Sequence, residues 1–205
     1  RVRCHLAGAL PARGMRNAAA HSHAAQAAQP LLQVDGLKVH FPIRRGFIQR
    51  TVGHVRAVDD VSLSIQAGRT LALVGESGCG KTTVGKALLR LIEPTAGTIV
   101  LGGETITAKN ASTLRRQAQM VFQDPFSSLN PRMRVADILL EGMDALGVGA
   151  ASQRRDAVAQ LLRQVGLPDD AGGRYPHAFS GGQRQRIAIA RALAVSPRLV
   201  ICDEP

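Results

Sequence analysis

The chain has 205 residues, which allows one domain or one domain with a small subdomain. One Tyr and no Trp disfavour a base-stacking nucleic-acid module. A net charge of +11 suits nucleic acid or an anionic membrane surface, although a solvated arginine-rich surface is the simpler explanation.

Residues 1–30 predict a disordered tail that is basic and rich in alanine. A transit peptide is the weaker alternative, because proline and glycine interrupt any sustained apolar face. The chain begins with Arg1 and stops at Pro205, so we expect a fragment of a longer protein, with Met15 as the first plausible initiator. Since no apolar run approaches the ~20 residues of a spanning helix, we do not expect a membrane segment.

Two stretches of alternating apolar and polar residues follow the tail. Residues 31–39 and 58–65 predict half-exposed strands, and the basic residues 42–56 between them predict a loop or a hairpin excursion. Residues 70–74 are a short continuous apolar run, which predicts a strand buried on both faces of a mainly parallel sheet. Further strand candidates, both short and apolar, are residues 98–101 and 119–122.

A phosphate-binding loop comes directly after the apolar run. It matches G-x-x-x-x-G-K-[ST] and precedes a helix predicted at residues 81–92. Its glycines let backbone N–H groups approach phosphate oxygens, and the helix N-terminus adds partial positive charge. Lys81 should reach the β- and γ-phosphates, and the Thr82 hydroxyl can ligate Mg²⁺. The alternative is a chance glycine-rich turn. The predicted nucleotide-binding residues of this loop and its helix are Gly75, Glu76, Ser77, Gly78, Cys79, Gly80, Lys81, Thr82 and Thr83.

Cys79 lies in this loop, close to Lys81 and to a helix N-terminus, and both features favour a reactive thiol. We therefore predict that alkylation of Cys79 blocks ATP binding and that ATP protects the thiol. A small filler residue is the alternative. The other cysteines, Cys4 and Cys202, form no CxxC pair with it, which argues against zinc and fits a reducing, cytosolic compartment.

Residues 125–178 predict a helical insertion in an otherwise α/β pattern, because their apolar residues recur at helical spacing. Ser152 is the predicted N-cap of the second helix, which Gly166 and Pro168 should end.

A third helix is predicted from Ser180 to about Ala194. Ser180 is a favourable N-cap and forms a capping-box pattern with Gln183. Gly181 and Gly182 lower the stability of the first turn, but they expose its backbone N–H groups to an anion such as a γ-phosphate presented by another subunit. An ordinary helix cap is the alternative.

The last predicted strand, residues 199–202, also has the composition of a buried strand. Asp203 at its carboxyl end is placed to hold Mg²⁺, directly or through water. Glu204 can act as general base or orient the attacking water. A solvated acidic turn is the alternative.

These motifs, in this order and at this spacing, closely resemble the nucleotide-binding subunit of ABC transporters. Gly75–Thr82 resembles the Walker A motif and Leu199–Glu204 the Walker B motif. Phe179–Gln183 resembles the signature motif, with Phe179 where leucine is usual. Gln123 resembles the glutamine of the Q-loop.

A finer resemblance is to the oligopeptide/dipeptide importer branch, carried by residues 119–131 and 174–186. Nickel importers share much of it. Residues 201–204 lean toward the F-type ATPase of peptide importers.

The resemblance implies an α/β fold: a P-loop NTPase (RecA-like) core with an N-terminal β-subdomain and an inserted α-helical subdomain, incomplete at the C-terminus. Residues 31–205 would form a partial ABC-type nucleotide-binding domain, with residues 125–178 as the helical subdomain. We expect this fragment to be poorly stable and to hydrolyse ATP weakly or not at all, because the family requires further elements beyond Pro205.

The resemblance also assigns roles to residues. The implied cofactors are ATP and Mg²⁺, with Lys81, Gln123 and Glu204 as catalytic residues and Thr82, Gln123 and Asp203 as Mg²⁺ ligands. An aromatic residue stacks on adenine in this family. Phe41 is the first candidate and Phe47 and Phe179 are poorer ones, although Phe41 fits a core position equally well.

By the same resemblance, two subunits pair head to tail, and the signature motif of each completes the ATP site of the other. Two membrane permeases are implied as direct partners, a solute-binding protein as an indirect one, and the cytoplasmic face of the inner or plasma membrane as the location. The alternatives are a soluble ABC-type ATPase acting on nucleic acid or ribosomes, a P-loop kinase or GTPase, and an inactive fragment. The importer prediction expects no nucleic-acid partner.

Overall fold

The computed structural model describes residues 5–7, 29–46, 49–124 and 128–204. The chain divides into two compact units, Arg1–Ala111 and Ser112–Pro205. Each unit has its own set of buried apolar side chains.

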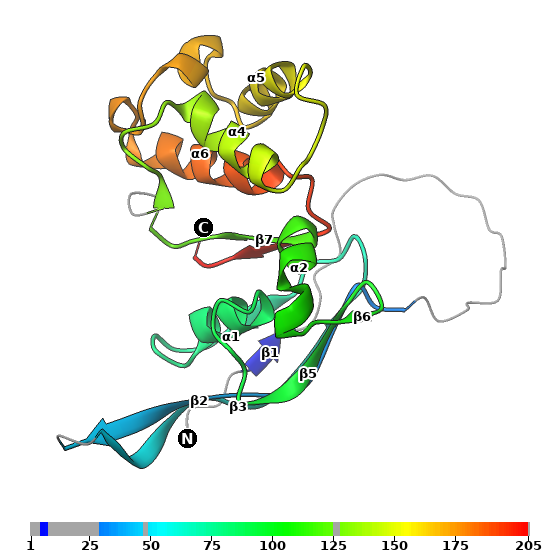
Figure 1. Ribbon diagram of the computed structural model, residues 1–205, viewed down its shortest axis with the longest axis vertical. Helices are drawn as coiled ribbons and strands as arrows, with labels where there is room; N and C mark the ends of the chain where they lie inside the picture. Colours follow the sequence, from blue (N-terminus) through cyan, green and yellow to red (C-terminus); the bar gives the residue numbers. More distant parts are fainter. Residues whose placement is uncertain (1–4, 8–28, 47–48, 125–127, 205) are drawn as a thin grey trace, which may run out of the picture. The chain divides into compact units, whose positions relative to one another are not determined.

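The first unit is built on a four-stranded antiparallel sheet with the strand order β3-β2-β5-β6 (Figure 1). Its strands are β2 (Leu32–Arg45), β3 (Arg50–Ile65), β5 (Ala96–Leu101) and β6 (Glu104–Thr105). Alternate side chains of β2 and β5 are buried, as the sequence pattern predicts. These core residues are Leu32, Val34, Leu37, Val39, Ile99 and Leu101.

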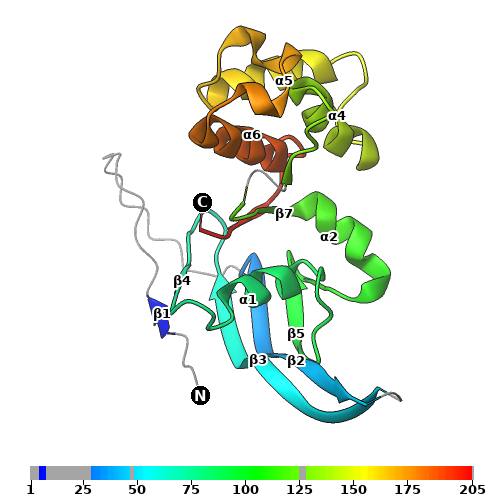
Figure 2. The same cartoon turned by 90° about the vertical axis from the view of Figure 1, so that its left-hand side faces the viewer.

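Between the two predicted strands, the described residues of 42–56 pair as a hairpin rather than forming a loop. Pairing between β2 and β3 continues to Arg45 opposite Arg50, whereas the pairing of β5 with β2 reaches only Lys38. The two strands therefore run past β5 as a two-stranded ribbon (Figures 1 and 2). Their register shifts at four places, one of them between Ile43 and Arg44.

The phosphate-loop strand β4 (Ala72–Val74) pairs antiparallel with β1 (His5–Ala7), which lies within the stretch predicted as tail. The prediction of a strand buried on both faces is wrong, because the Val74 side chain is 54% exposed. In the part of the chain that the structure describes, β1 is the only strand paired with β4.

Helix α1 (Lys81–Leu88) follows the loop and buries Val84, Ala87 and Leu88. It ends four residues earlier than predicted. Arg90 adopts a left-handed φ of 49°, and its N–H and that of Leu91 bond back to the last turn. The 3₁₀ turn η1 (Ala108–Asn110) and the short helix α2 (Ala111–Gln117) come after β6.

In the second unit, β7 (Ala118–Val121) and β8 (Leu199–Cys202) form a parallel pair. The prediction that β8 is buried on both faces is wrong, since alternate residues are exposed, Val200 among them. Besides α2, which starts at the last residue of the first unit, its described helices and 3₁₀ turns are α4 (Val135–Ala145), α5 (Arg154–Gln164), η2 (Asp169–Gly173), η3 (Pro176–Ala178) and α6 (Gly181–Leu193).

Helices α4, α5 and α6 pack around one apolar cluster that includes Leu139, Leu162 and Ile187. Helices α4 and α5 both end at a glycine with positive φ, Gly147 and Gly166, and backbone bonds close each end. The stop predicted at Gly166 is thus confirmed. The N-cap predicted at Ser152 is wrong, because residues 151–153 form a turn and α5 begins one residue later than a cap at Ser152 requires.

Candidate nucleotide-binding site

The phosphate-binding loop is shaped by two glycines with positive φ, Gly78 at 78° and Gly80 at 98°. Gly80 is the N-cap of α1, and a Cβ there would lie 2.3 Å from the backbone oxygen of Ala57 on β3. A side chain is therefore excluded at Gly80 both by conformation and by space. The loop gains its form from its own glycines and from contact with β3.

Lys81 is held inside the same loop. Its Nζ donates to the backbone oxygens of Gly75 at 2.9 Å and Glu76 at 2.8 Å. These bonds keep the ammonium group beside the backbone that is predicted to cradle the phosphates, at the N-terminus of α1. Thr82 and Thr83 follow in the first turn and are partly buried.

Cys79 is buried, with 8% of its surface exposed, and its Sγ lies 4.0 Å from Lys81 Nζ. A buried thiol gives an alkylating reagent little access. This burial favours the filler role over the reactive one, and the alkylation prediction still needs a measurement.

A second group of predicted residues lies at the carboxyl ends of β7 and β8. The register pairs Val121 with Cys202, and the Asp203 N–H donates to the Val121 oxygen at 3.0 Å. Just beyond, Gln123 Nε2 donates a hydrogen bond to Glu204 Oε2. Parallel strands bring both ends to one edge, which is how residues 81 positions apart come together.

The donor atoms of this group fit Mg²⁺, a hard cation that takes oxygen ligands. Gln123 donates its amide N–H to Glu204, so its Oε1 is not used in that bond and could serve as a cation ligand. Asp203 adds a partly buried carboxylate. The remaining predicted ligand, the Thr82 hydroxyl, belongs to the first unit.

The signature helix α6 begins as predicted. Gln183 N–H donates to Ser180 Oγ at 3.4 Å, and Ser180 N–H donates to Gln183 Oε1 at 3.0 Å, which confirms the capping box. Gly181 and Gly182 are exposed, and no atom lies within 4 Å of a Cβ added to either. The first turn therefore leaves room for a large anionic group to approach.

Two arginines that sequence reasoning missed support this helix start. Arg184 Nε donates to the backbone oxygens of Pro176 at 2.9 Å and Phe179 at 3.0 Å. The Arg174 guanidinium lies over the Phe179 ring, 4.7 Å from its centroid. Nothing in the arginine-rich sequence distinguishes these two side chains from solvated ones.

The aromatic residues predicted as candidates for stacking on adenine differ in their burial. Phe179 is buried in the helical cluster, so it cannot stack on a nucleotide, and Phe47 lies outside the described residues. Phe41 is 40% exposed on β2, so the core alternative is wrong. It pairs with Val55, two residues before the Ala57 carbonyl that meets Gly80. Adenine stacking by Phe41 stays a prediction.

Residues 58–205 match the model of the ABC transporter family, so the chain belongs to this family. The oligopeptide transport ATP-binding protein AppF of Bacillus subtilis is 49% identical over 181 residues, which cover 86% of this chain and 55% of AppF. The glutathione import ATP-binding protein GsiA of Salmonella choleraesuis is 48% identical over 179 residues, 86% of this chain and 29% of GsiA. The chain thus spans about half the length of AppF and less of GsiA.

A solved structure agrees with this assignment at the level of the fold. The dimeric ATP-binding cassette MJ0796 bound to ADP and phosphate superposes with a TM-score of 0.69 at 23% identity, covering 84% of this chain and 73% of that one. The predicted P-loop NTPase fold class is therefore confirmed. Within the described residues, no helix combines the length and apolarity needed to cross a bilayer.

Proposed function

We propose that this chain is the ATP-binding and ATP-hydrolysing subunit that powers an ABC importer of peptides. The observation that carries the proposal is the open first turn of α6, capped by Ser180 and Gln183 and lined by exposed glycines. A phosphate-binding loop alone is common to many nucleotide-binding proteins. Two glycines after a serine cap lower the stability of the helix, and no contact among the described residues explains them. Binding of an anionic ligand at the exposed N–H groups is the better explanation.

Within this function, each chain supplies three groups to its own ATP. Lys81 and the loop N–H groups bind the phosphates, Asp203 and Thr82 hold Mg²⁺, and Glu204 orients or deprotonates the attacking water. The hydrogen bond from Gln123 fixes the Glu204 carboxylate. The first turn of α6 then completes the ATP site of a second subunit in a head-to-tail dimer.

Dimerisation by ATP tests this arrangement in the full-length protein. Glu204→Gln should block hydrolysis, while the new side-chain oxygen can still accept the hydrogen bond from Gln123. This variant should dimerise with ATP and stay monomeric without it, as measured by light scattering. Adding Ser180→Arg should weaken dimerisation at least ten-fold, because the arginine fills the open turn. Binding of a fluorescent ATP analogue to the single chain should be unchanged.

The matched control is Ser152→Arg, which adds the same charge to an exposed serine before α5. It should leave ATP-driven dimerisation intact. A dimer that survives Ser180→Arg, or one lost equally in both variants, contradicts the composite site and leaves only an ATP-binding chain.

The importer part of the proposal rests on the relatives, which are named as oligopeptide, peptide and glutathione transport proteins. These names favour a peptide importer over an ATPase of nucleic acid or ribosomes. We infer that two permeases anchor the dimer at the cytoplasmic face of the membrane and that a solute-binding protein delivers the cargo. Transporter reconstituted in vesicles should hydrolyse ATP faster with a peptide-loaded binding protein than with a nickel-loaded one. The reverse preference contradicts the peptide assignment.

A further inference from the structure

The exposed part of the β2–β3 hairpin has an unusual charge. We call residues 41–45 and 50–56 the arginine ribbon. It contains four arginines and no acidic residue. One of them, Arg56, lies 3.4 Å from Asp59, the first acid after the ribbon. The other three are exposed, and within the described parts of the chain none of them forms an ion pair or a side-chain hydrogen bond. These three are Arg44, Arg45 and Arg50.

Two of these arginines face each other. Arg45 and Arg50 are directly opposite in the register of the antiparallel pair, and Arg44 is next in the chain. Like charges at opposed positions destabilise a sheet. These three arginines therefore repel one another, and no described residue neutralises them. Binding to a polyanion outside the chain would replace this repulsion with attraction.

The same ribbon exposes aliphatic side chains. Ile43, Val52 and Val55 are 40%, 58% and 54% exposed. Ile43 pairs with Gly53, and its Cδ1 lies 3.7 Å from the position of a Cβ on that glycine, so Ile43 projects on the same face as Val55. Because Gly53 has no side chain to cover it, the isoleucine lies over the glycine and remains partly exposed.

We propose that the arginine ribbon docks on a bilayer surface that contains anionic phospholipids. Guanidinium groups bind the lipid phosphates, and the aliphatic side chains enter the boundary between headgroups and acyl chains. The combination favours lipid over nucleic acid, because a phosphate backbone offers no site for exposed isoleucine and valine. The inference rests on the proposed function, which places the protein at a membrane.

Vesicle flotation of the full-length protein without permeases tests the proposal. The protein should bind vesicles containing about a third phosphatidylglycerol and should not bind pure phosphatidylcholine. Changing the three unpaired arginines to glutamine should lower the partition coefficient about 100-fold, at about five-fold for each residue. Binding should also disappear in about 1 M salt, where the screening length is ~3 Å.

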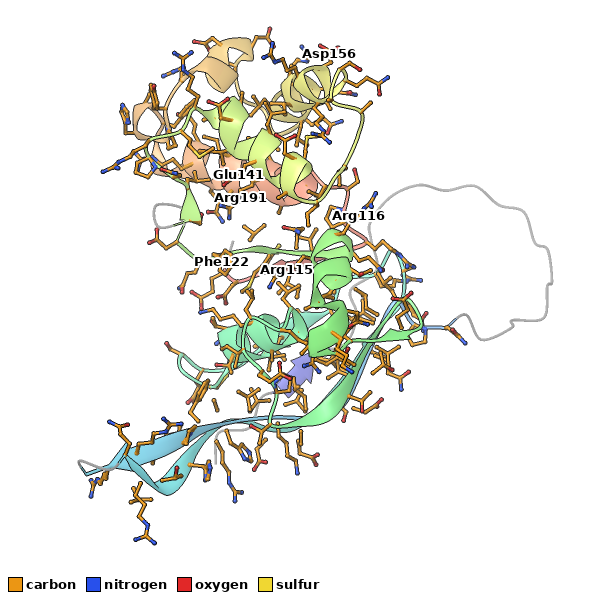
Figure 3. All side chains as sticks on the ribbon, in the orientation of Figure 1. Arg115, Arg116, Phe122, Glu141, Asp156 and Arg191 are labelled. Carbon is orange, nitrogen blue, oxygen red and sulfur yellow. The ribbon has the colours of Figure 1, made fainter. Side chains whose placement is uncertain are left out.

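A matched variant separates the ribbon from the general positive charge of the protein. Arg115 and Arg116 on α2, labelled in Figure 3, and Arg155 on α5 are exposed arginines elsewhere in the chain. Changing these three to glutamine removes the same charge and should change the partition coefficient by less than about two-fold. An equal loss in both triple variants overturns the proposal.

Two further readouts complete the test. Ile43→Ser with Val55→Ser should weaken vesicle binding while the salt dependence stays unchanged. A single-stranded oligonucleotide should compete poorly with the vesicles, and tight oligonucleotide binding that is lost in the ribbon variant overturns the proposal in favour of nucleic acid. ATP-driven dimerisation is measured on the same samples. Its failure would count against the proposed function, whereas its persistence without vesicle binding would count against the ribbon alone.

Discussion

At the scale of single residues, Gly80 carries the tightest constraint in the phosphate-binding loop. We expect Gly80→Ala to lower the free energy of unfolding by more than 2 kcal/mol, the upper end of the roughly 1–2 kcal/mol for a left-handed residue, because the Cβ also meets the Ala57 oxygen. Urea unfolding of the purified protein measures this difference.

Gly78→Ala is the matched control. Gly78 has a similar positive φ of 78°, but no atom lies within 4 Å of an added Cβ. This variant should lose only about 1 kcal/mol, the cost of the backbone conformation alone. Equal losses in the two variants would show that crowding against β3 contributes nothing.

Residue roles that depend on local pattern could be predicted from the sequence. The capping box of Ser180 and Gln183 is one such case, because both partners lie in the same helical turn. The bond between Gln123 and Glu204 could not be predicted, since it depends on the register of two strands far apart in the chain. The burial of Cys79 could not be predicted either, because the motif specifies the spacing of its residues and not their exposure.

At the scale of elements, Arg191 joins α6 to the chain that follows Gln123. Its guanidinium donates to the Ser128 oxygen, and burial lowers its pKa, while the charge of Glu141 on α4 raises it. Figure 3 labels Glu141 on α4 and Arg191 on α6. One helix thus carries the signature turn at its start and contacts Ser128, five residues after Gln123, near its end.

We expect Arg191→Met to lower the free energy of unfolding by about 1–3 kcal/mol, because it leaves the Ser128 oxygen without this donor. If the contact also positions Gln123, kcat for ATP should fall while KM stays nearly constant, and Arg191→Lys should restore part of kcat. Arg155→Met, an exposed change on α5, is the control. A stability loss with normal kcat would limit Arg191 to a structural role.

The elements themselves were predicted in type better than in extent. Helical periodicity located α4 and α5, the capping pattern of Ser180 and Gln183 located the start of α6, and alternation located β2 and β3. The ends of the elements were less predictable. Helix α1 ends before Arg90, which has a left-handed φ, and α5 begins after a turn that contains Ser152. The identity of neither residue predicts its conformation. The hairpin extended well beyond the alternating stretches because its strands pair with each other even where one face is not buried.

At the scale of the whole molecule, the two units have separate cores. Leu139 is fully buried in the helical cluster, so Leu139→Ala should destabilise the second unit by about 2–5 kcal/mol. Hydrogen exchange should then show lost protection in α4, α5 and α6 and unchanged protection in β2 and β5. Leu101→Ala, in the core of the first unit, should give the opposite pattern. Uniform loss in both variants would show that the chain unfolds as one cooperative body.

The fold class was predictable because several motifs occur in one order at one spacing, and each needs a strand before it or a helix after it. The burial of β4 and β8 was not. A continuous apolar run predicts cover on both faces, but that cover comes from helices packed on the sheet, and the residues of the run do not specify them.

The contact between Gln123 and Glu204 has a consequence for chemical ageing of the protein. Deamidation would turn the glutamine into a carboxylate, which has no N–H to donate to Glu204. The fold would survive this one-atom change. Aged protein would then keep its phosphate-binding loop intact while the Glu204 carboxylate lost the hydrogen bond from Gln123.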